Sequence, residues 1–175
     1  MELEQFLKSV ERRAYRIAEI ATGNVDDALD VLQDAMYKLA QKYADRPSEE
    51  WGPLFQTILQ SRIKDHHRRN FVRNRYRVWF SHRGDEDPQD PIQTAEDEHA
   101  VSPEDAIDMD STMKVLEQAV RQLPGRQQQA FMLRALEGLD VKETARIMKC
   151  SEGSVKTHYF RALTTLKEKL SDYEL

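Results

Sequence analysis

The sequence predicts an all-α protein: two small helical domains, joined by an acidic linker. Apolar residues recur every three to four positions on both sides of residues 84–110, which is the spacing of amphipathic helices. No segment shows the alternation of apolar and polar residues that would predict a β-strand. Residues 84–110 instead hold 11 acids, no lysine or arginine and three of the six prolines. We therefore place domain boundaries at residues 1–83, 84–110 and 111–175.

The first domain, residues 1–83, is expected to contain three amphipathic helices. Gly23 and Asn24 separate the first two, Pro47 precedes the third, and Gly52 and Pro53 fall near its first turn, where helix breakers are tolerated. The apolar positions that define the helices are Leu3, Phe6, Leu7, Val10, Ala14, Ile17 and Ala21, then Ala28, Leu29, Leu32, Met36, Leu39, Ala40 and Tyr43, then Trp51, Leu54, Phe55, Ile58, Leu59 and Ile63. Their spacing indicates a helical bundle with one buried core.

The middle segment, "GDEDPQDPIQTAEDEHAVSPEDAIDMD", is expected to be a flexible linker. It has almost no large apolar residues, so it cannot bury enough surface to offset the entropy cost of ordering. The negative charge of this segment also masks the positive net charge of the two segments that flank it. Residues 1–83 hold 15 basic and 12 acidic side chains, and residues 111–175 hold 11 and 8, although the whole chain has a net charge of -5. Both ends are therefore mildly basic.

The second domain, residues 111–175, is expected to contain four helices. One covers residues 113–123 and stops at Pro124 and Gly125, and a second covers residues 126–137 and stops at Gly138. Asp140 and Glu143 have the spacing of a capping box at the start of a short third helix. Ser151 caps the fourth helix, whose apolar stripe is Val155, Tyr159, Ala162, Leu163, Leu166 and Leu170. The last two helices form a helix-turn-helix.

Composition excludes several classes of protein. Charged residues make up 33% of the chain, and no apolar run approaches the length of a bilayer span. The N-terminus carries acids where a signal peptide needs basic and then apolar residues, which predicts a cytoplasmic protein without membrane insertion. Cys150 is the only cysteine, so an internal disulfide and a cysteine-based zinc site are excluded.

No catalytic constellation is found, so we expect no enzyme activity, no cofactor and no metal. His66 and His67 are adjacent and point about 100° apart on a helix, so they cannot share a metal ion. We expect both at the edge of the domain or against phosphates. The chain also lacks a glycine loop that could hold a phosphate.

The fourth helix of the second domain is a candidate for reading duplex DNA. Opposite its apolar stripe it displays Ser154, Lys156, Thr157, Phe160 and Arg161, which suit base edges, thymine methyl groups and phosphates in a major groove. The alternative is a solvated helix face. Phe160 argues against that alternative, because an exposed aromatic among cations serves contact with DNA or a partner better than contact with water.

The stretch "RRNFVRNRYRVWF", Arg68 to Phe80, combines five arginines and four aromatics without an acid. Cations neutralise phosphates, and aromatic faces stack on unpaired bases. This pattern favours capture of single-stranded nucleic acid by the segment from Arg62 to Arg83. Trp79 and Phe80, with Val78, are interpreted instead as core residues.

The second helix presents a polar face that suits a basic protein partner. It consists of Asp27, Asp30, Gln33, Asp34 and Tyr37. Asp30 and Asp34 repel each other across one turn, a cost of a few tenths of a kcal/mol that a basic partner would remove. Surface solubility is the alternative interpretation of this face.

Two parts of the sequence resemble the extracytoplasmic-function sigma factors of bacterial RNA polymerase. "QLPGRQQQAFMLRALEGLDVKETARIMKCSEGSVKTHYFRALTTLKEKL" is similar to their C-terminal promoter-reading domain. "DALDVLQDAMYKLAQKY" and "WGPLFQTILQSRIKDHHRRN" are similar to their N-terminal domain, in the same order. The sequence departs from the family pattern at four positions. Ser61 replaces a usual asparagine, Leu29 a usual acid, Gly125 a usual proline and Lys149 a usual glycine. At Lys149 a left-handed backbone costs a residue other than glycine about 1 kcal/mol, a strain that a rearranged turn would relieve.

The resemblance implies a role for each candidate surface. The recognition helix would bind the -35 element. Strand capture at the -10 element would fall to Ser61, Lys64, Arg68, Arg69, Phe71, Arg73, Arg75 and Tyr76. The face from Asp27 to Tyr37 would dock on core RNA polymerase at the clamp helices of the largest subunit, with further contact at the flap region. The linker would pass through the basic cleft of polymerase, and an anti-sigma factor is a partner that many family members require.

Two functions are compatible with these observations. The first is a sigma factor that directs core polymerase to promoters. The second is a stand-alone dimeric helix-turn-helix regulator, which would need a dimer interface and has no use for a strand-capturing segment. A complex with core polymerase distinguishes the first from the second.

Overall fold

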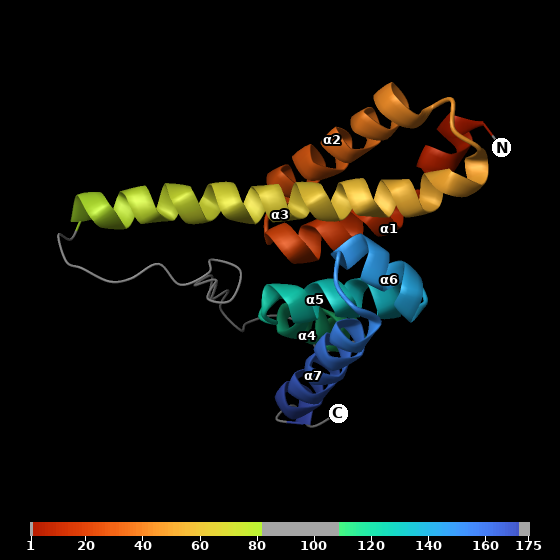
Figure 1. Cartoon of the computed structure of the whole chain (residues 1–175). Helices are drawn as coiled ribbons and strands as arrows, with labels where there is room; N and C mark the ends of the chain where they lie inside the picture. Colours follow the sequence, from red (N-terminus) through yellow and green to blue (C-terminus); the bar gives the residue numbers. More distant parts are fainter. Residues whose placement is uncertain (1, 82–108, 172–175) are drawn as a thin grey trace.

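The structure, a computed structural model, describes residues 2–81 and 109–171, and the side chains of residues 2–75 and 113–171. All regular secondary structure within these residues is helical, as predicted. The elements are α1 (Leu3–Thr22), α2 (Val25–Tyr43), α3 (Ser48–Ser81), α4 (Met109–Arg121), α5 (Gly125–Phe131), the π turn η1 (Met132–Leu136), α6 (Val141–Met148) and α7 (Glu152–Ser171). Figure 1 shows α1–α3 as one bundle and α4–α7 as a second bundle against it.

The first bundle forms where the apolar stripes predict it. Gly23 ends α1 with φ 71°, and its N–H donates to the Glu19 carbonyl at 2.9 Å. The Asn24 side chain then caps α2 by accepting from the Asp27 N–H at 3.1 Å. Most of the predicted apolar positions are buried, including Ala14, Ile17, Ala28, Leu32, Leu39, Phe55 and Leu59. The Gly23–Asn24 break therefore has the predicted role.

Helix α3 begins five residues before Pro53, so Gly52 and Pro53 lie inside the helix, just after its first turn and close to the predicted position. Trp51 holds this first part in place: its ring lies 5.8 Å from that of Phe6, and its Nε1–H donates to the Tyr43 carbonyl at 3.0 Å. A proline near a helix start removes few hydrogen bonds. The contacts of Trp51 with Phe6 and Tyr43 therefore anchor the first part of α3.

The second bundle contains the predicted elements with one difference. The predicted helix over residues 126–137 divides into α5 and the π turn η1 before it stops at Gly138, whose φ is 69°. The expected linker, residues 84–110, lies outside the described residues apart from Met109 and Asp110, which begin α4. Buried Gln128 ties α5 to the end of α4, since its Nε2 donates to the Val120 carbonyl at 3.2 Å.

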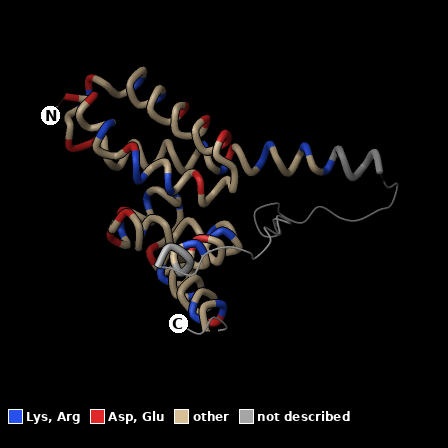
Figure 2. The backbone as a smooth tube through the Cα atoms, turned by 180° about the vertical axis from the view of Figure 1, so that it is seen from behind, with Lys and Arg blue, Asp and Glu red and all other residues tan. Residues whose placement is uncertain are grey.

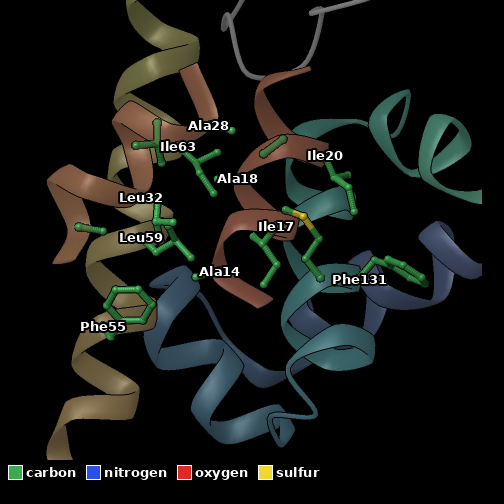
Figure 3. Packing of buried hydrophobic residues seen from close by; sticks show 14 of the residues in the cluster. Ala14, Ile17, Ala18, Ile20, Ala28, Leu32, Phe55, Leu59, Ile63 and Phe131 are labelled. Carbon is green, nitrogen blue, oxygen red and sulfur yellow. The ribbon is translucent and has the colours of Figure 1, made fainter. Parts of the chain in front are cut away.

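The two bundles pack on each other, which the sequence did not predict. One apolar cluster includes Ile17 and Ile20 of α1 together with Phe131 of α5 and Met132 of η1, and Figure 3 shows Ile17 and Ile20 directed toward the side of Phe131. Arg16 of α1 forms an ion pair with Glu117 of α4. The two bundles are therefore joined by an apolar core and an ion pair.

None of the helices in the described parts of the chain combines the length and apolar character that a bilayer crossing requires.

Candidate nucleic-acid interface

The helix-turn-helix consists of α6, a short turn and α7. At its start the predicted capping box is present: Asp140 Oδ1 accepts from the Glu143 N–H at 2.7 Å, and Glu143 Oε2 accepts from the Asp140 N–H at 3.2 Å. Lys149 closes α6 in the left-handed conformation, with φ 53° and ψ 50°. The turn is therefore not rearranged, and the chain tolerates the local strain of a lysine at this position.

Helix α7 is anchored along one face. The Ser151 hydroxyl caps it by accepting from the Ser154 N–H at 3.1 Å, as predicted. Val155, Ala162 and Leu166 are buried against the other helices. This anchoring fixes which side chains of α7 point outward.

The predicted DNA-reading residues lie mainly on the exposed face of α7. Lys156, Thr157 and Arg161 are exposed, and Phe160 is 70% exposed. Ser154 is half-buried, and its hydroxyl lies 2.9 Å from that of Ser151. Leu163 was expected in the apolar stripe but is exposed. It follows Ala162 by one position, which turns it about 100° away from the core and toward the Phe160 face.

Two features at the base of α7 were not predicted. The Tyr159 ring lies 6.4 Å from that of Phe131, and the Arg134 guanidinium lies 5.7 Å from the Tyr159 ring centroid. The pKa of His158 is lowered by burial, and then by the nearby positive charges of Arg126 and Arg161. The lowered pKa favours the neutral form of His158.

The second candidate surface is the C-terminal half of α3. Figure 1 shows this half extending beyond the bundle, and Figure 2 shows lysines and arginines along it. The exposed predicted residues are Ser61, Lys64, Arg68, Arg69, Arg73 and Arg75, and Phe71 is half-buried. Tyr76 lies on the same helix, but its side chain is outside those described, as are those of Val78, Trp79 and Phe80. The cations are accessible from solvent on several sides.

His66 corrects the prediction that both histidines lie at the edge of the domain. It is 8% exposed, because α2 packs over this part of α3. Its Nε2 lies 2.8 Å from Asn70 Nδ2 and 3.7 Å from Asp27 Oδ2. The His67 ring lies 5.8 Å from it, with the two planes at 68°. Across the described residues, no group of three or more histidines, cysteines and acids is arranged to hold a metal ion.

The acidic face of α2 lies beside the basic face of α3. Asp30, Gln33 and Asp34 are exposed, and Tyr37 is 67% exposed, whereas Asp27 is half-buried against His66. Val25 is also exposed, and so is Leu29, which was expected in the apolar stripe; it follows buried Ala28 by one position, which turns it about 100° away from the core. A shallow groove separates the two faces and is lined by Asp27, Asp30, Val31, Gln33, Asp34, Arg62, His66, Arg69, Asn70 and Arg73. Two surfaces that the sequence suggested separately are thus neighbours.

Comparison with known proteins gives consistent results. Residues 113–166 match the family Sigma-70, region 4. The chain is 34% identical over 164 residues to the ECF RNA polymerase sigma factor BldN of Streptomyces coelicolor, covering 90% of this chain and 56% of BldN. It is 29% identical over 176 residues to the RNA polymerase sigma-E factor of the same species, covering 97% of this chain and 86% of that protein. The chain thus spans little more than half of BldN but most of sigma-E.

A solved structure extends the likeness to the fold. The sigma factor RpoE of Bartonella quintana, in complex with the anti-sigma factor NepR, matches with a TM-score of 0.61 and 22% identity over 98% of this chain and 99% of that one. The region 4 match contains the helix-turn-helix, and the relatives align through both bundles. The chain is therefore similar in sequence, through both bundles, to RNA polymerase sigma factors, and similar in fold to a solved one.

Proposed function

We propose that this protein is an alternative sigma factor that binds core RNA polymerase and directs it to specific promoters. The observation that carries the proposal is the presence, in one compact chain, of an anchored helix-turn-helix and a separate exposed row of arginines on α3. A duplex-binding regulator needs only the first. The combination suits promoter opening, in which one element stays paired and another is melted.

In this proposal α7 reads the -35 element as duplex DNA. The exposed side chains of Lys156, Phe160 and Arg161 are supported by Val155 and Ala162, which fix the helix on the bundle. Arginine and lysine discriminate bases through their donors, and an aromatic ring contacts thymine methyl groups. Ser154 and Thr157 complete the face.

Strand capture at the -10 element belongs to α3. Lys64, Arg68, Arg69, Arg73 and Arg75 hold phosphates of the unpaired strand. Phe71 and Tyr76 stack on its bases, and Ser61 lies at the start of the same surface. The support is the exposure of the cations along a helix whose described residues after His66 contain no buried side chain.

Docking on polymerase belongs to the outward face of α2. Asp27, Asp30, Gln33, Asp34 and Tyr37 meet the clamp helices of the largest subunit, and the flap region gives a further contact. The acidic linker, residues 84–110, joins domains 1–83 and 111–175 and passes through the basic cleft. The protein acts in the cytoplasm without enzyme activity, and an anti-sigma factor is a further partner.

The test of docking is gel filtration of the purified chain with core polymerase. We expect a 1:1 complex. In vitro transcription with a promoter library should then show that this complex initiates at a subset of the promoters. The double variant Asp30→Lys and Asp34→Lys should abolish co-elution while leaving helicity intact. The matched control, Asp45→Lys and Glu49→Lys, makes the same charge change on two exposed acids outside the α2 face. Elution as a free homodimer would favour the stand-alone regulator instead.

A further inference from the structure

A line of polar contacts connects the two neighbouring surfaces of the first bundle. It begins at Asp27 of α2, whose Oδ2 lies 3.7 Å from His66 Nε2. It continues from His66 Nε2 to Asn70 Nδ2 at 2.8 Å. It ends where Arg73 Nη2 donates to Asn70 Oδ1 at 3.0 Å. His66 is buried and Arg73 is exposed, so the line runs from the covered face of α3 to solvent.

The direction of each hydrogen bond follows from donor and acceptor chemistry. A guanidinium can only donate, so the Asn70 amide must present its oxygen to Arg73. The amide nitrogen then faces His66, and an amide NH₂ also only donates. His66 Nε2 must therefore accept, which requires that this nitrogen carry no proton.

We propose that His66 is a positioning residue for strand capture: with Nε2 unprotonated, it orients the Asn70 amide so that its oxygen restrains Arg73. This inference rests on the proposed function, because it assigns Arg73 to the phosphates of the captured strand. A restrained guanidinium loses less side-chain entropy when it binds a phosphate. The contact therefore contributes to affinity even though Asn70 and His66 do not touch the strand.

Protonation of His66 reverses the arrangement. An Nε2–H would face the Asn70 NH₂ donor to donor, so the amide must turn its oxygen toward the imidazolium. The NH₂ group then faces Arg73, which can only donate, and the restraint is lost. The imidazolium is instead attracted to Asp27, whose carboxylate is within ion-pair distance. Histidine ordinarily titrates near neutral pH, which makes the two arrangements accessible.

The charges around His66 link this equilibrium to docking. Among the residues whose side chains the structure describes, the charged and titratable groups in or beside the groove include Asp27, Asp30 and Asp34 from α2, and Arg62, Asp65, His67, Arg69 and Arg73 from α3. The α2 carboxylates favour the imidazolium, and the α3 arginines oppose it. A basic partner that binds the α2 acids weakens the first influence. Docking on polymerase would thus favour neutral His66 and a restrained Arg73.

The experiment measures binding of holoenzyme to a pre-melted promoter fragment by fluorescence anisotropy, from about pH 8 to about pH 5.5, a range that spans ordinary histidine titration. The affinity of the wild-type holoenzyme should fall roughly 2- to 10-fold as pH falls, which corresponds to the loss of one hydrogen bond. His66→Gln can still accept from Asn70 through its Oε1, so it should keep the high-pH affinity throughout. Asn70→Ala should bind weakly with no such pH dependence.

The matched control is His67→Gln, the same change one position along the helix. Because His67 is a neighbouring group and not part of the line of contacts, this variant should still lose affinity as pH falls. Wild-type pH dependence in His66→Gln would overturn the inference, as would an equal loss of affinity at every pH in that variant. Arg68→Ala tests the proposed function separately, since Arg68 is outside the line of contacts. If Arg68→Ala weakens binding while His66→Gln follows wild type, only the role of His66 fails.

Discussion

Helices α3 and α7 both present cations, yet the protein holds them in opposite ways. Helix α7 has buried residues spread along it, from Val155 through Ala162 to Leu166. Helix α3 is buried only up to His66, and beyond that point its described side chains, residues 67–75, are half-buried or exposed. The difference fits the two targets proposed for these helices. A major groove must meet one fixed face, whereas an unpaired strand can be held by a helix that is accessible from several sides.

The largest expected effect compares the same substitution on both helices. Val155→Ala removes two buried methyl groups and leaves a cavity, so it should lower the free energy of unfolding by about 2–3 kcal/mol. Val72→Ala, on the 47% exposed Val72 of α3, should change it by less than about 0.5 kcal/mol. Denaturant unfolding followed by circular dichroism measures both. Similar losses would mean that the outer part of α3 is packed as firmly as α7.

DNA binding should separate the two helices next. Arg161→Ala and Lys156→Ala should each weaken binding to the -35 duplex by about 1–3 kcal/mol if they contact bases. Arg68→Ala and Arg69→Ala should weaken binding to any sequence, and each should reduce the slope of log affinity against log salt by roughly 0.7 to 0.9. Anisotropy titrations at several salt concentrations test both pairs. Sequence-dependent losses in the α3 variants would contradict a purely phosphate role.

Aromatic side chains give a matching contrast. Phe71→Ala should cost about 1–3 kcal/mol on a pre-melted promoter fragment and almost nothing on closed duplex. Phe160→Ala should affect the closed -35 duplex instead, without loss of thermal stability, because its ring is 70% exposed. Equal losses on both DNAs together with a lower melting temperature would show that Phe71 belongs to the core.

A smaller effect is expected at the turn that presents α7. Lys149→Gly relieves the left-handed backbone of a residue with φ 53°, and the greater entropy of glycine in the unfolded chain offsets part of the gain. The free energy of unfolding should rise by about 0.5–1 kcal/mol. Lys149→Ala is the control, since it keeps a Cβ and should bring no gain. A destabilised glycine variant would show that the lysine side chain supports the turn.

The smallest effect concerns the contact between the two bundles. Burial raises the pKa of Glu137, while Arg13 and a hydrogen bond from Gln56 act in the opposite direction. A carboxyl whose folded pKa lies above its unfolded value contributes stability below the unfolded pKa and loses it as pH rises through the folded value. Glu137→Gln should therefore slightly raise the melting temperature at neutral pH, and the difference should vanish in acid. A difference that grows in acid would contradict this sign.

The sequence predicted the features that local chemistry determines. The Asn24–Gly23 break, the Asp140–Glu143 capping box and the Ser151 cap depend on neighbours within a few residues, and each has the expected geometry. The burial of His66 depends on which face of α3 α2 covers, and the ion pair of Arg16 with Glu117 joins residues about a hundred positions apart. Neither carries a local signal. Leu163 was wrongly predicted to be buried, because it lies at the edge of the apolar stripe of α7. Whether a residue at such an edge is covered depends on the neighbouring helices, and the local sequence does not show this.

The π turn at Met132–Leu136 follows a helix that contributes to two cores. A π turn contains one residue more than an α-helical turn, so it shifts the faces that precede and follow it. Four consecutive residues around its start, Ala130 to Leu133, are buried: Phe131 and Met132 lie in the core shared with α1, and Ala130 and Leu133 lie in the helix-turn-helix core. Deleting one residue from the π turn should rotate the residues that follow it, including Leu139, relative to the buried residues that precede it. The segment is thus intolerant of length change, although it looks in sequence like any other helix.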